Sequence, residues 1–254
     1  MSNENIDNTV SIDKSNILLK GSLQVYSNLI TKILQLIGLI FVARLLGPNP
    51  IGVIGYTAGI VGLFSIIANI GFSTTHRKKI SEGKDLGRCI GTYFTIRMIL
   101  MTIWVSALLF WVNYSKYISN SFVLTGEQES VLYIVAAYTV IYGHSGIMRH
   151  TFWANLEASK TIVPKLIARV VTVSLKIIVA LLGLNVLYLA SAQLVGYIFL
   201  IIILFYFFRK YPFKLPNKEY LKDYILFTIP LMLTVPLNQL AVHSDSAMIG
   251  YFWG

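Results

Sequence analysis

Seven long apolar stretches recur along this chain, and they constrain its fold more than any motif does. Each is long enough, as a helix of about 20 residues, to cross a hydrocarbon core of roughly 30 Å. Because lipid offers the backbone no hydrogen-bond partners, helices are the expected spanning form. The sequence therefore predicts an all-α integral membrane protein with about seven transmembrane helices. The stretches lie at about residues 22–45, 51–72, 89–113, 130–150, 163–183, 185–208 and 222–242.

The composition excludes a soluble domain. Hydrophobic residues make up 56% of the 254 residues, and the mean hydropathy is +0.68. A soluble protein of this composition would expose large apolar patches and aggregate. Charged residues are only 13% of the chain, so their positions carry most of the information about topology.

Basic residues gather in alternate loops. If the N-terminus is cytoplasmic, the opposite side of the membrane holds only Arg44 and Lys116. This bias predicts a multi-pass protein of the cytoplasmic membrane, with the tail and the loops after the second, fourth and sixth spans in the cytoplasm. Topology then explains the net charge of +10 without nucleic acid, and anionic lipids are the expected counter-charge. The cytoplasmic set is Lys14, Lys20, Arg77, Lys78, Lys79, Lys84, Arg88, Arg149, Lys160, Lys165, Arg169, Arg209, Lys210, Lys214, Lys218 and Lys222.

The chain divides into three parts. Residues 1–15 are polar and mixed in charge, which predicts a flexible cytoplasmic tail without the features of a signal peptide. Residues 16–210 predict an N-terminal lobe of six helices, in which Gly183-Leu184-Asn185 separates the fifth and sixth spans. Residues 211–254 predict a cytoplasmic loop followed by the seventh helix.

Polar residues form stripes inside several spans. Lys32, Arg97 and Lys176 lie within spans, where a charge at the centre of an isolated helix costs roughly 2.5–3.5 kcal/mol. Helical spacing places these cations on faces shared with other polar residues. The stripes are Gln24, Asn28, Lys32 and Gln35 in the first span, Ser65 and Asn69 in the second, Tyr93 and Arg97 in the third, and Lys165, Arg169, Thr172 and Lys176 in the fifth.

Two interpretations fit these stripes. The long basic side chains could reach the headgroups, and the amides could bond between helices. Alternatively, the stripes face a wet cationic cavity. No Asp or Glu occurs within the first six spans to neutralise such a cavity, so its ligand would be anionic, as phosphate or pyrophosphate is. The candidate substrate-binding residues are Gln24, Asn28, Lys32, Asn69, Arg97, Arg169 and Lys176.

No catalytic constellation is visible. The chain has no GxxxxGK[ST] loop for ATP, and its four histidines show no HExxH pattern. The single cysteine, Cys89, forms no metal-binding spacing with histidine. The sequence therefore predicts a protein that is not an enzyme, needs no cofactor or metal, and transports without hydrolysing ATP itself.

Five short segments together resemble a known family. The turn between the first two spans reads ARLLGPNPIG, close to an "A-R-x-L-G-P-x-x-[YF]-G" signature, although Pro50-Ile51 stands where an aromatic often precedes the last glycine. These segments resemble the polysaccharide transporter branch, the O-antigen or lipid-linked oligosaccharide flippases, of the multidrug/oligosaccharidyl-lipid/polysaccharide exporter superfamily. The segments are 43–52, Gly71-Phe72 with Arg77-Lys78-Lys79, 156–160, Ile229-Pro230 and 245–252.

The resemblance implies a flippase for an isoprenoid-pyrophosphate-linked oligosaccharide that works by alternating access. It implies 12 to 14 helices in two lobes, so residues 211–254 would include the start of a truncated second lobe. An ion gradient or the membrane potential could drive export, and polysaccharide assembly enzymes are the expected partners. Combined with the stripes, it predicts a cavity lined by the first, third and fifth spans. There Lys32, Arg97 and Lys176 would contact the diphosphate, and Gln24, Asn28, Gln35 and Asn69 the sugars.

Other functions stay open at this point. A multidrug exporter of the same superfamily usually carries an acidic residue in its helices, which the first six spans lack. A peptidoglycan-precursor flippase is poorly separated by sequence. A membrane-embedded glycosyltransferase or polymerase would need a larger outer loop than 114–129, whose carboxylates are Glu127 and Glu129. A membrane scaffold is the remaining alternative.

Overall fold

The computed structural model describes residues 3–68, 70–119, 124–232, 244–245 and 248, with side chains from residue 21 onward except at 118 and 119. These residues fold almost entirely as helices and form no strand. The elements are α1 (Asn3–Leu46), α2 (Asn49–Ser65), the 3-10 turn η1 (Ile66–Ala68), α3 (Phe72–Ser81), α4 (Leu86–Tyr114), the π-helical turn η2 (Ser115–Ser119), α5 (Gly126–Ala154), α6 (Ser159–Leu181), α7 (Val186–Phe208) and α8 (Lys218–Thr228).

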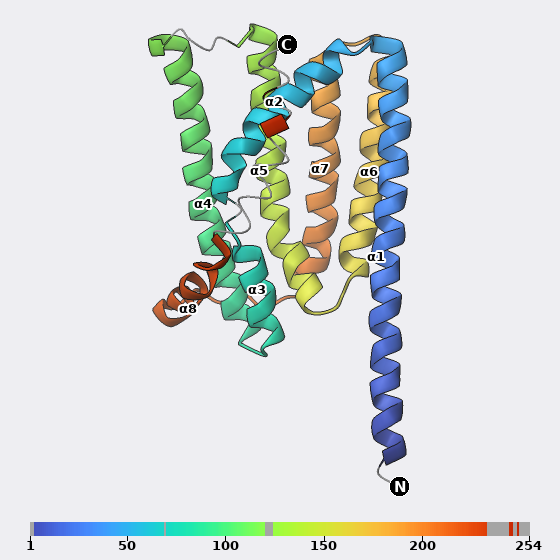
Figure 1. Cartoon of the computed structure of the whole chain (residues 1–254), viewed down its shortest axis with the longest axis vertical. Coiled ribbons are helices and arrows are strands. Elements are labelled where there is room, and N and C mark those ends of the chain that lie inside the picture. The colour runs from blue at the N-terminus through green and yellow to red at the C-terminus, as the bar shows by residue number, and fades with distance from the viewer. Residues whose placement is uncertain (1–2, 69, 120–123, 233–243, 246–247, 249–254) are drawn as a thin grey trace.

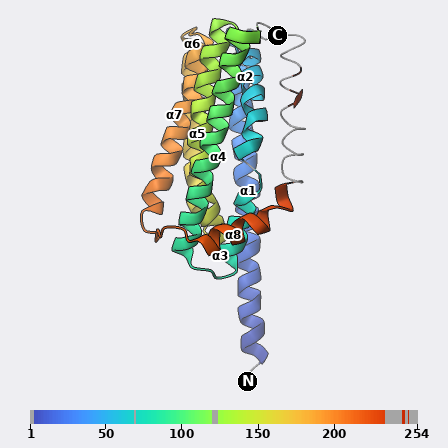
Figure 2. The ribbon, with the colours of Figure 1, turned by 90° about the vertical axis from the view of Figure 1, so that its left-hand side faces the viewer.

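Five long helices stand side by side and a sixth crosses them. In Figure 1, α1, α4, α5, α6 and α7 run roughly parallel or antiparallel, and α2 descends obliquely from the end of α1. The two short helices, α3 and α8, lie at the lower end, where α8 runs across the bundle (Figure 2). The N-terminus is at the same lower end. The loops that the charge pattern assigns to one side of the membrane therefore share one end of the molecule.

Within the part of the chain that the structure describes, five helices have the length and apolarity that a membrane span needs. The sixth long helix, α6, is long enough but carries Lys160, Lys165, Arg169 and Lys176, and it packs against α1 and α7 within the same bundle. The prediction of an all-α membrane protein is thus confirmed. The five candidate spans are Gly21–Leu46, Asn49–Ala68, Leu86–Tyr117, Gly126–Ala154 and Val186–Phe208.

The break between the fifth and sixth predicted spans is confirmed. Gly183 adopts φ 61 just after α6, a left-handed conformation that costs glycine little. The Leu184 amide donates to the Val179 carbonyl at 3.1 Å, which satisfies one of the last carbonyls of α6. Asn185 then caps α7 by accepting from the Leu187 amide at 3.2 Å.

Both ends of the expected span pattern differ in detail. Helix α1 begins at Asn3, so it runs through the segment 1–15 that the sequence analysis assigned to a tail. The first residues of the seventh expected span, 222–242, belong instead to the short helix α8, which begins at Lys218, where Asn217 caps it by accepting from the Tyr220 amide, and ends at Thr228. The remainder of that span, 233–242, lies outside the described residues.

The basic segment after the second span was expected as a loop, and that expectation is wrong. Residues 72–81 form α3, a short amphipathic helix. Its buried face carries Thr75, His76, Lys79 and Ile80, whereas Arg77 is exposed. Because most of the buried positions are polar, the pattern of hydrophobic residues in this segment does not show the helical period.

Three side chains of α3 bond to α8, and we call this the α3–α8 contact. Thr75 and Thr228 share a hydrogen bond of 2.7 Å between their hydroxyls. One turn earlier on α8, His76 Nδ1 lies 3.0 Å from the Tyr224 hydroxyl. Lys79 Nζ donates to Asp223 Oδ1 at 2.7 Å, and Lys84 pairs with the other carboxylate oxygen.

His76 is fully buried at this contact and bonds through both ring nitrogens. Its Nε2 lies 2.9 Å from Thr151 Oγ1, and that hydroxyl donates to the Ile147 carbonyl. Nε2 therefore carries the hydrogen, which leaves Nδ1 as an acceptor facing the Tyr224 hydroxyl, whose oxygen also lies 3.4 Å from the Cys89 carbonyl oxygen, a second acceptor. The ring also stacks on Tyr93 at 4.4 Å between centroids. Burial, with the nearby Arg77 charge, lowers the pKa of His76 from 6.5 to about 3.

The depressed pKa predicts that acid loosens the α3–α8 contact. A detached His76 binds a proton below pH 6.5, whereas the docked ring stays neutral down to about pH 3. Docking is fully present above pH 6.5 and weakens as pH falls, by about 1.4 kcal/mol per unit. Burial raises the pKa of Asp223, but the hydrogen bonds from Lys79 and Lys84 outweigh burial and lower that pKa below its ordinary value of 3.8. Asp223 therefore stays ionised over most of the range between pH 6.5 and pH 3.

Spin-label distances between α3 and α8, with labels at the exposed positions 78 and 222, measure this effect. We expect a detached population that grows as pH falls from 6.5 toward 4. His76→Gln removes the titration, so its distance distribution should not vary with pH over this range. A pH dependence that is the same in His76→Gln would contradict the assignment to His76.

Helices α6 and α7 pack closely at Gly196. A Cβ at Gly196 of α7 would lie 1.8 Å from Thr172 Oγ1 and 3.1 Å from the Ala168 carbonyl oxygen. The backbone carbonyl cannot rotate away, so an added methyl must push the helices apart. We expect Gly196→Ala to destabilise the fold by roughly 1–3 kcal/mol, the usual cost of overpacking. Thermal unfolding in detergent measures this, and Gly55→Ala, which meets nothing within 4 Å, should be neutral or stabilising.

Candidate functional site

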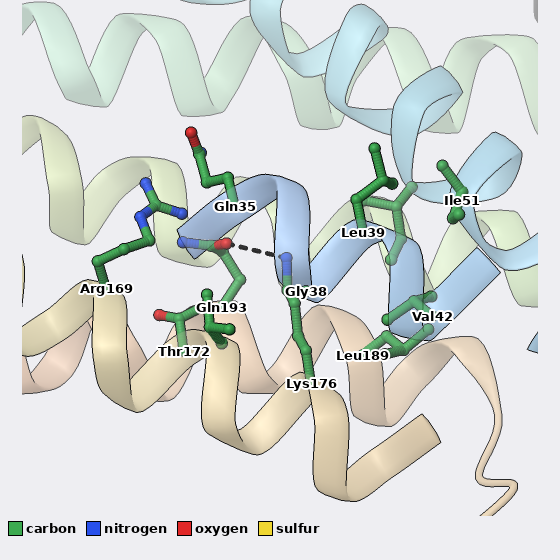
Figure 3. A pocket seen from close by; sticks show the side chains of 12 residues that line it. Gln35, Gly38, Leu39, Val42, Ile51, Arg169, Thr172, Lys176, Leu189 and Gln193 are labelled. Atoms are coloured by element: carbon green, nitrogen blue, oxygen red, sulfur yellow. Dashed lines mark hydrogen bonds between the residues drawn. The ribbon is translucent and has the colours of Figure 1, made fainter. Parts of the chain in front are cut away.

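A pocket opens between four helices of the bundle (Figure 3). Its volume is about 260 Å³. Helices α1 and α6 form its two long walls, and α2 and α7 close it. The lining residues are Gln35, Gly38, Leu39 and Val42 of α1, Ile51 and Ile54 of α2, Arg169, Thr172, Val173 and Lys176 of α6, and Leu189 and Gln193 of α7.

The polar side chains of this pocket come from three helices and lie toward one another. Lys176 Nζ donates to Gln193 Oε1 at 3.1 Å, across α6 and α7. Arg169 lies against the Gln35 amide of α1, whose oxygen, when turned toward the guanidinium, accepts from Nη1 and Nη2 at 3.1 and 3.2 Å. Two cations are thus held by neutral amides, which have the capacity to bond an additional ligand.

A smaller pocket of about 50 Å³ continues the same polar surface toward the lower end. It shares Arg169, Thr172 and Gln193 with the larger pocket and adds Lys165 of α6. Lys165 Nζ donates to Asn28 Oδ1 of α1 at 2.8 Å, and the Gln24 amide donates to the same oxygen at 3.2 Å. We call Lys165, Arg169 and Lys176 the α6 cation row.

The charged residues that line the two pockets are all basic. None of the residues that line either pocket carries a carboxylate. In the printed sequence the acidic residues nearest to α6 and α7 are Glu157, before α6, and Glu219, after α7. Glu157 is engaged with Lys160 at 2.6 Å and with the Tyr211 hydroxyl. Cations in a low-polarity bundle attract an anion strongly, so the pocket is suited to a phosphate or carboxylate group and unsuited to a cation.

The structure brings together some of the predicted substrate-binding residues. Arg169 and Lys176 line the larger pocket, and Gln24 and Asn28 belong to the polar chain that continues from it. Lys32 is exposed on α1 and does not line either pocket. Asn69 lies outside the described residues. Substrate binding by each of these side chains stays a prediction.

Arg97 lies in a different place from the α6 cation row. It is buried in α4, with 8% of its surface exposed, and donates to the carbonyls of Gly143 in α5 and Ala68 in η1. The expected cavity wall from the third span is therefore absent from the pocket, where α2 and α7 stand instead. At Ala68 the guanidinium satisfies a carbonyl at the end of η1, which is the favourable end of a helix for a cation.

Among the polar side chains that line the larger pocket, Gln193 is the one that the sequence did not predict. It lies in α7, a helix that reads as uniformly apolar apart from a few small or aromatic polar residues. A lone glutamine in such a helix is itself a signal, because a side-chain amide in lipid needs a partner. Its partner could not be named without knowing that α7 packs on α6. Within the described residues no group of His, Cys, Asp and Glu is placed to hold a metal ion.

Comparisons with known proteins bear on the family and on the fold. A family model described as "Polysaccharide biosynthesis protein" matches residues 18–254. A comparison with curated proteins gives no match. The inward-facing conformation of a multidrug resistance MATE family transporter of the MOP superfamily has 18% identity and a TM-score of 0.60, over 86% of this chain and 52% of that one.

A second solved structure, a MOP superfamily transporter from Pyrococcus furiosus, has 16% identity and a TM-score of 0.49, over 93% of this chain and 63% of that one. The chain thus spans about half to two thirds of the length of these two solved transporters. The first likeness shows that the described fold corresponds to part of a MATE-type transporter.

Proposed function

Since the chain belongs to the polysaccharide biosynthesis protein family, we propose that it acts as part of an exporter of an isoprenoid-diphosphate-linked oligosaccharide. The exporter moves this lipid from the cytoplasmic to the outer leaflet of the cytoplasmic membrane by alternating access, for synthesis of a cell-surface polysaccharide or glycan. The protein transports its substrate and does not transform it. The lower end of the bundle, with the N-terminus and the basic loops, faces the cytoplasm.

The observation that carries this proposal is the α6 cation row facing neutral amides, with no carboxylate among the lining residues. A diphosphate diester carries two negative charges at neutral pH. Each cation at about 4 Å from such a charge contributes roughly 4 kcal/mol at an effective dielectric constant of 20. Arg169 and Lys176 would hold the diphosphate, while the isoprenoid chain stays in lipid.

The neutral groups of the pocket suit the first sugar. Gln35, Thr172 and Gln193 present amide and hydroxyl groups beside the cations, and such groups match sugar hydroxyls as donors and acceptors. The apolar lining from α1 and α2 lowers the polarity around the cations, which strengthens the electrostatic attraction. Anionic lipids would be the counter-charge for the exposed lysines Lys210, Lys218 and Lys222 at the lower end.

The test is a flipping assay with the full-length protein in proteoliposomes. Two fluorescent lipids carry the same oligosaccharide, one through a diphosphate and one through a neutral ether bond. We expect the protein to expose the diphosphate lipid on the opposite leaflet and to leave the neutral lipid in place. Equal flipping of both lipids would overturn the proposal. Transport of a cationic dye, with neither lipid flipped, would also overturn it, and is the outcome expected of a multidrug exporter.

A further inference from the structure

The larger pocket holds two positive charges with unequal chemistry. Arg169 and Lys176 lie seven residues apart on α6, two turns or about 10.5 Å along the helix. The Arg guanidinium keeps its proton at any physiological pH, whereas a Lys amine loses its proton readily in surroundings that disfavour charge. Lys176 is half-buried, and its hydrogen-bond partner Gln193 is neutral. Of the two cations, only Lys176 can become neutral.

None of the described residues that line the pocket with Lys176 carries a negative charge. The lining residues of α1 and α2 are uncharged, and those of α7 are Leu189 and Gln193. On α6 itself the charged neighbours are Arg169 and, farther down, Lys165. The other titratable residues of the surrounding helices, from residue 21 onward, do not line this pocket. They are Tyr26, Lys32 and Arg44 on α1, Tyr56 on α2, Glu127, Glu129, Tyr133, Tyr138, Tyr142, His144, Arg149 and His150 on α5, Lys160 on α6, and Tyr188, Tyr197 and Tyr206 on α7. Before residue 21, α1 also carries Glu4, Asp7, Asp13, Lys14 and Lys20.

Repulsion between the two cations can be relieved in two ways. An anion can enter the pocket, or Lys176 can give its proton to water. These two events exclude each other, because an anion that contacts the amine stabilises the protonated form. With both cations present, the pocket balances the two charges of a diphosphate diester. With Lys176 neutral, the empty pocket keeps the single charge of Arg169.

We propose that Lys176 is a proton-binding site linked to the anion site, so that a phosphate-bearing headgroup and one proton bind to this pocket together and leave it together. The inference rests on the proposed function, because it assumes that the pocket takes an anionic headgroup. The proton comes from water on binding and returns to water on release. Coupling between the two ligands is reciprocal, so the proton raises the affinity for the anion by the factor by which the anion raises the affinity for the proton.

Linkage gives a measurable pH dependence. Once pH is high enough to deprotonate Lys176 in the empty pocket, the apparent affinity for the anion falls about tenfold per pH unit. Lys176→Arg keeps a charge that cannot be lost, so its affinity should not change on this alkaline limb. Lys176→Gln should bind at every pH with the weak affinity that the wild type reaches at high pH.

The probe is P1,P2-dimethyl diphosphate, a diester that stays fully ionised across the pH range used. Binding to the full-length protein in nanodiscs is measured by calorimetry between pH 6 and pH 10, in buffers of low and high ionisation enthalpy. The buffer dependence of the heat reports the protons taken up. We expect uptake that approaches one proton per bound probe at alkaline pH in the wild type and in Lys210→Arg, whose lysine is exposed and lines neither pocket, and none in Lys176→Arg.

The outcomes separate the two proposals. Binding without proton uptake at any pH would overturn the linkage and leave the anion site intact. Proton uptake that persists in Lys176→Arg would assign the proton to another group and overturn the role of Lys176. Failure of the wild type to bind the probe at any pH, in a preparation that is folded, would overturn the anion site itself and the proposed function with it.

Discussion

Replacing Arg169 and Lys176 together by glutamine is expected to reduce flipping of the diphosphate-linked oligosaccharide by roughly a hundredfold or more, without unfolding the protein. Removing one member of a desolvated charge pair typically costs 2–5 kcal/mol of binding free energy. The two cations hold neutral amides and no carboxylate in the larger pocket. Glutamine can still bond to Gln35 and Gln193, so the protein loses attraction for an anion but few internal contacts.

The measurement is the initial flipping rate in proteoliposomes at equal protein content, with melting temperature as the check on folding. The matched control is Lys210→Gln with Lys222→Gln, because both lysines are exposed at the lower end and away from the pocket. That variant also removes two positive charges, and we expect it to flip substrate at a rate near that of the wild type. Equal losses in the two variants would show that overall charge, and not the pocket, governs transport.

Arg97→Met is expected to act in the opposite way, by destabilising the fold while leaving the pocket's affinity intact. Loss of the guanidinium removes the donor to the Ala68 and Gly143 carbonyls. An orphaned buried polar group costs roughly 1–3 kcal/mol. The added space beside Gly143, where the Arg97 and Met101 side chains now pack, adds a packing term. A clear fall in the melting temperature should follow, with Arg97→Lys intermediate because it keeps one cationic donor.

Calorimetry with dimethyl diphosphate on the folded fraction separates the two roles of Arg97. The structure predicts wild-type affinity per folded molecule. If Arg97 instead contacts the diphosphate together with Lys176, as the polar stripes predict, the variant should bind weakly and keep normal stability. A variant of normal stability that no longer binds the probe would show that Arg97 contacts the substrate after all.

The spans were predictable because their signal is local. A helix that crosses a membrane needs a long apolar run, and a turn such as Gly183-Leu184-Asn185 interrupts such a run visibly. Helix α3 was missed because it has no such local signal. Its buried face is polar, and its partners Tyr224 and Thr228 lie about 150 residues away in the chain. Nothing near residues 72–81 indicates that those hydroxyls will be there.

The candidate site was predictable in part. The spacing of Lys165, Arg169 and Lys176 places them on one face of α6, and the structure has that face turned toward α1 and α7. Helical spacing does not tell which helices stand opposite. Gln193 was therefore missed. Arg97 was assigned to the same cavity because it lies within a span, but a buried arginine can also bond to backbone carbonyls, as Arg97 does. Neighbour relations between helices are the information that the stripes lack.

The most direct measurement is a structure of the full-length protein with its diphosphate-linked oligosaccharide bound. The α6 cation row predicts phosphate oxygens within about 2.9 Å of the Arg169 guanidinium and the Lys176 amine, the usual length of a charge-assisted hydrogen bond. The first sugar should then lie against Gln35 or Gln193. A diphosphate held elsewhere in the membrane, with Lys176 still bonded to Gln193 alone in the occupied state, would contradict the assignment of this pocket.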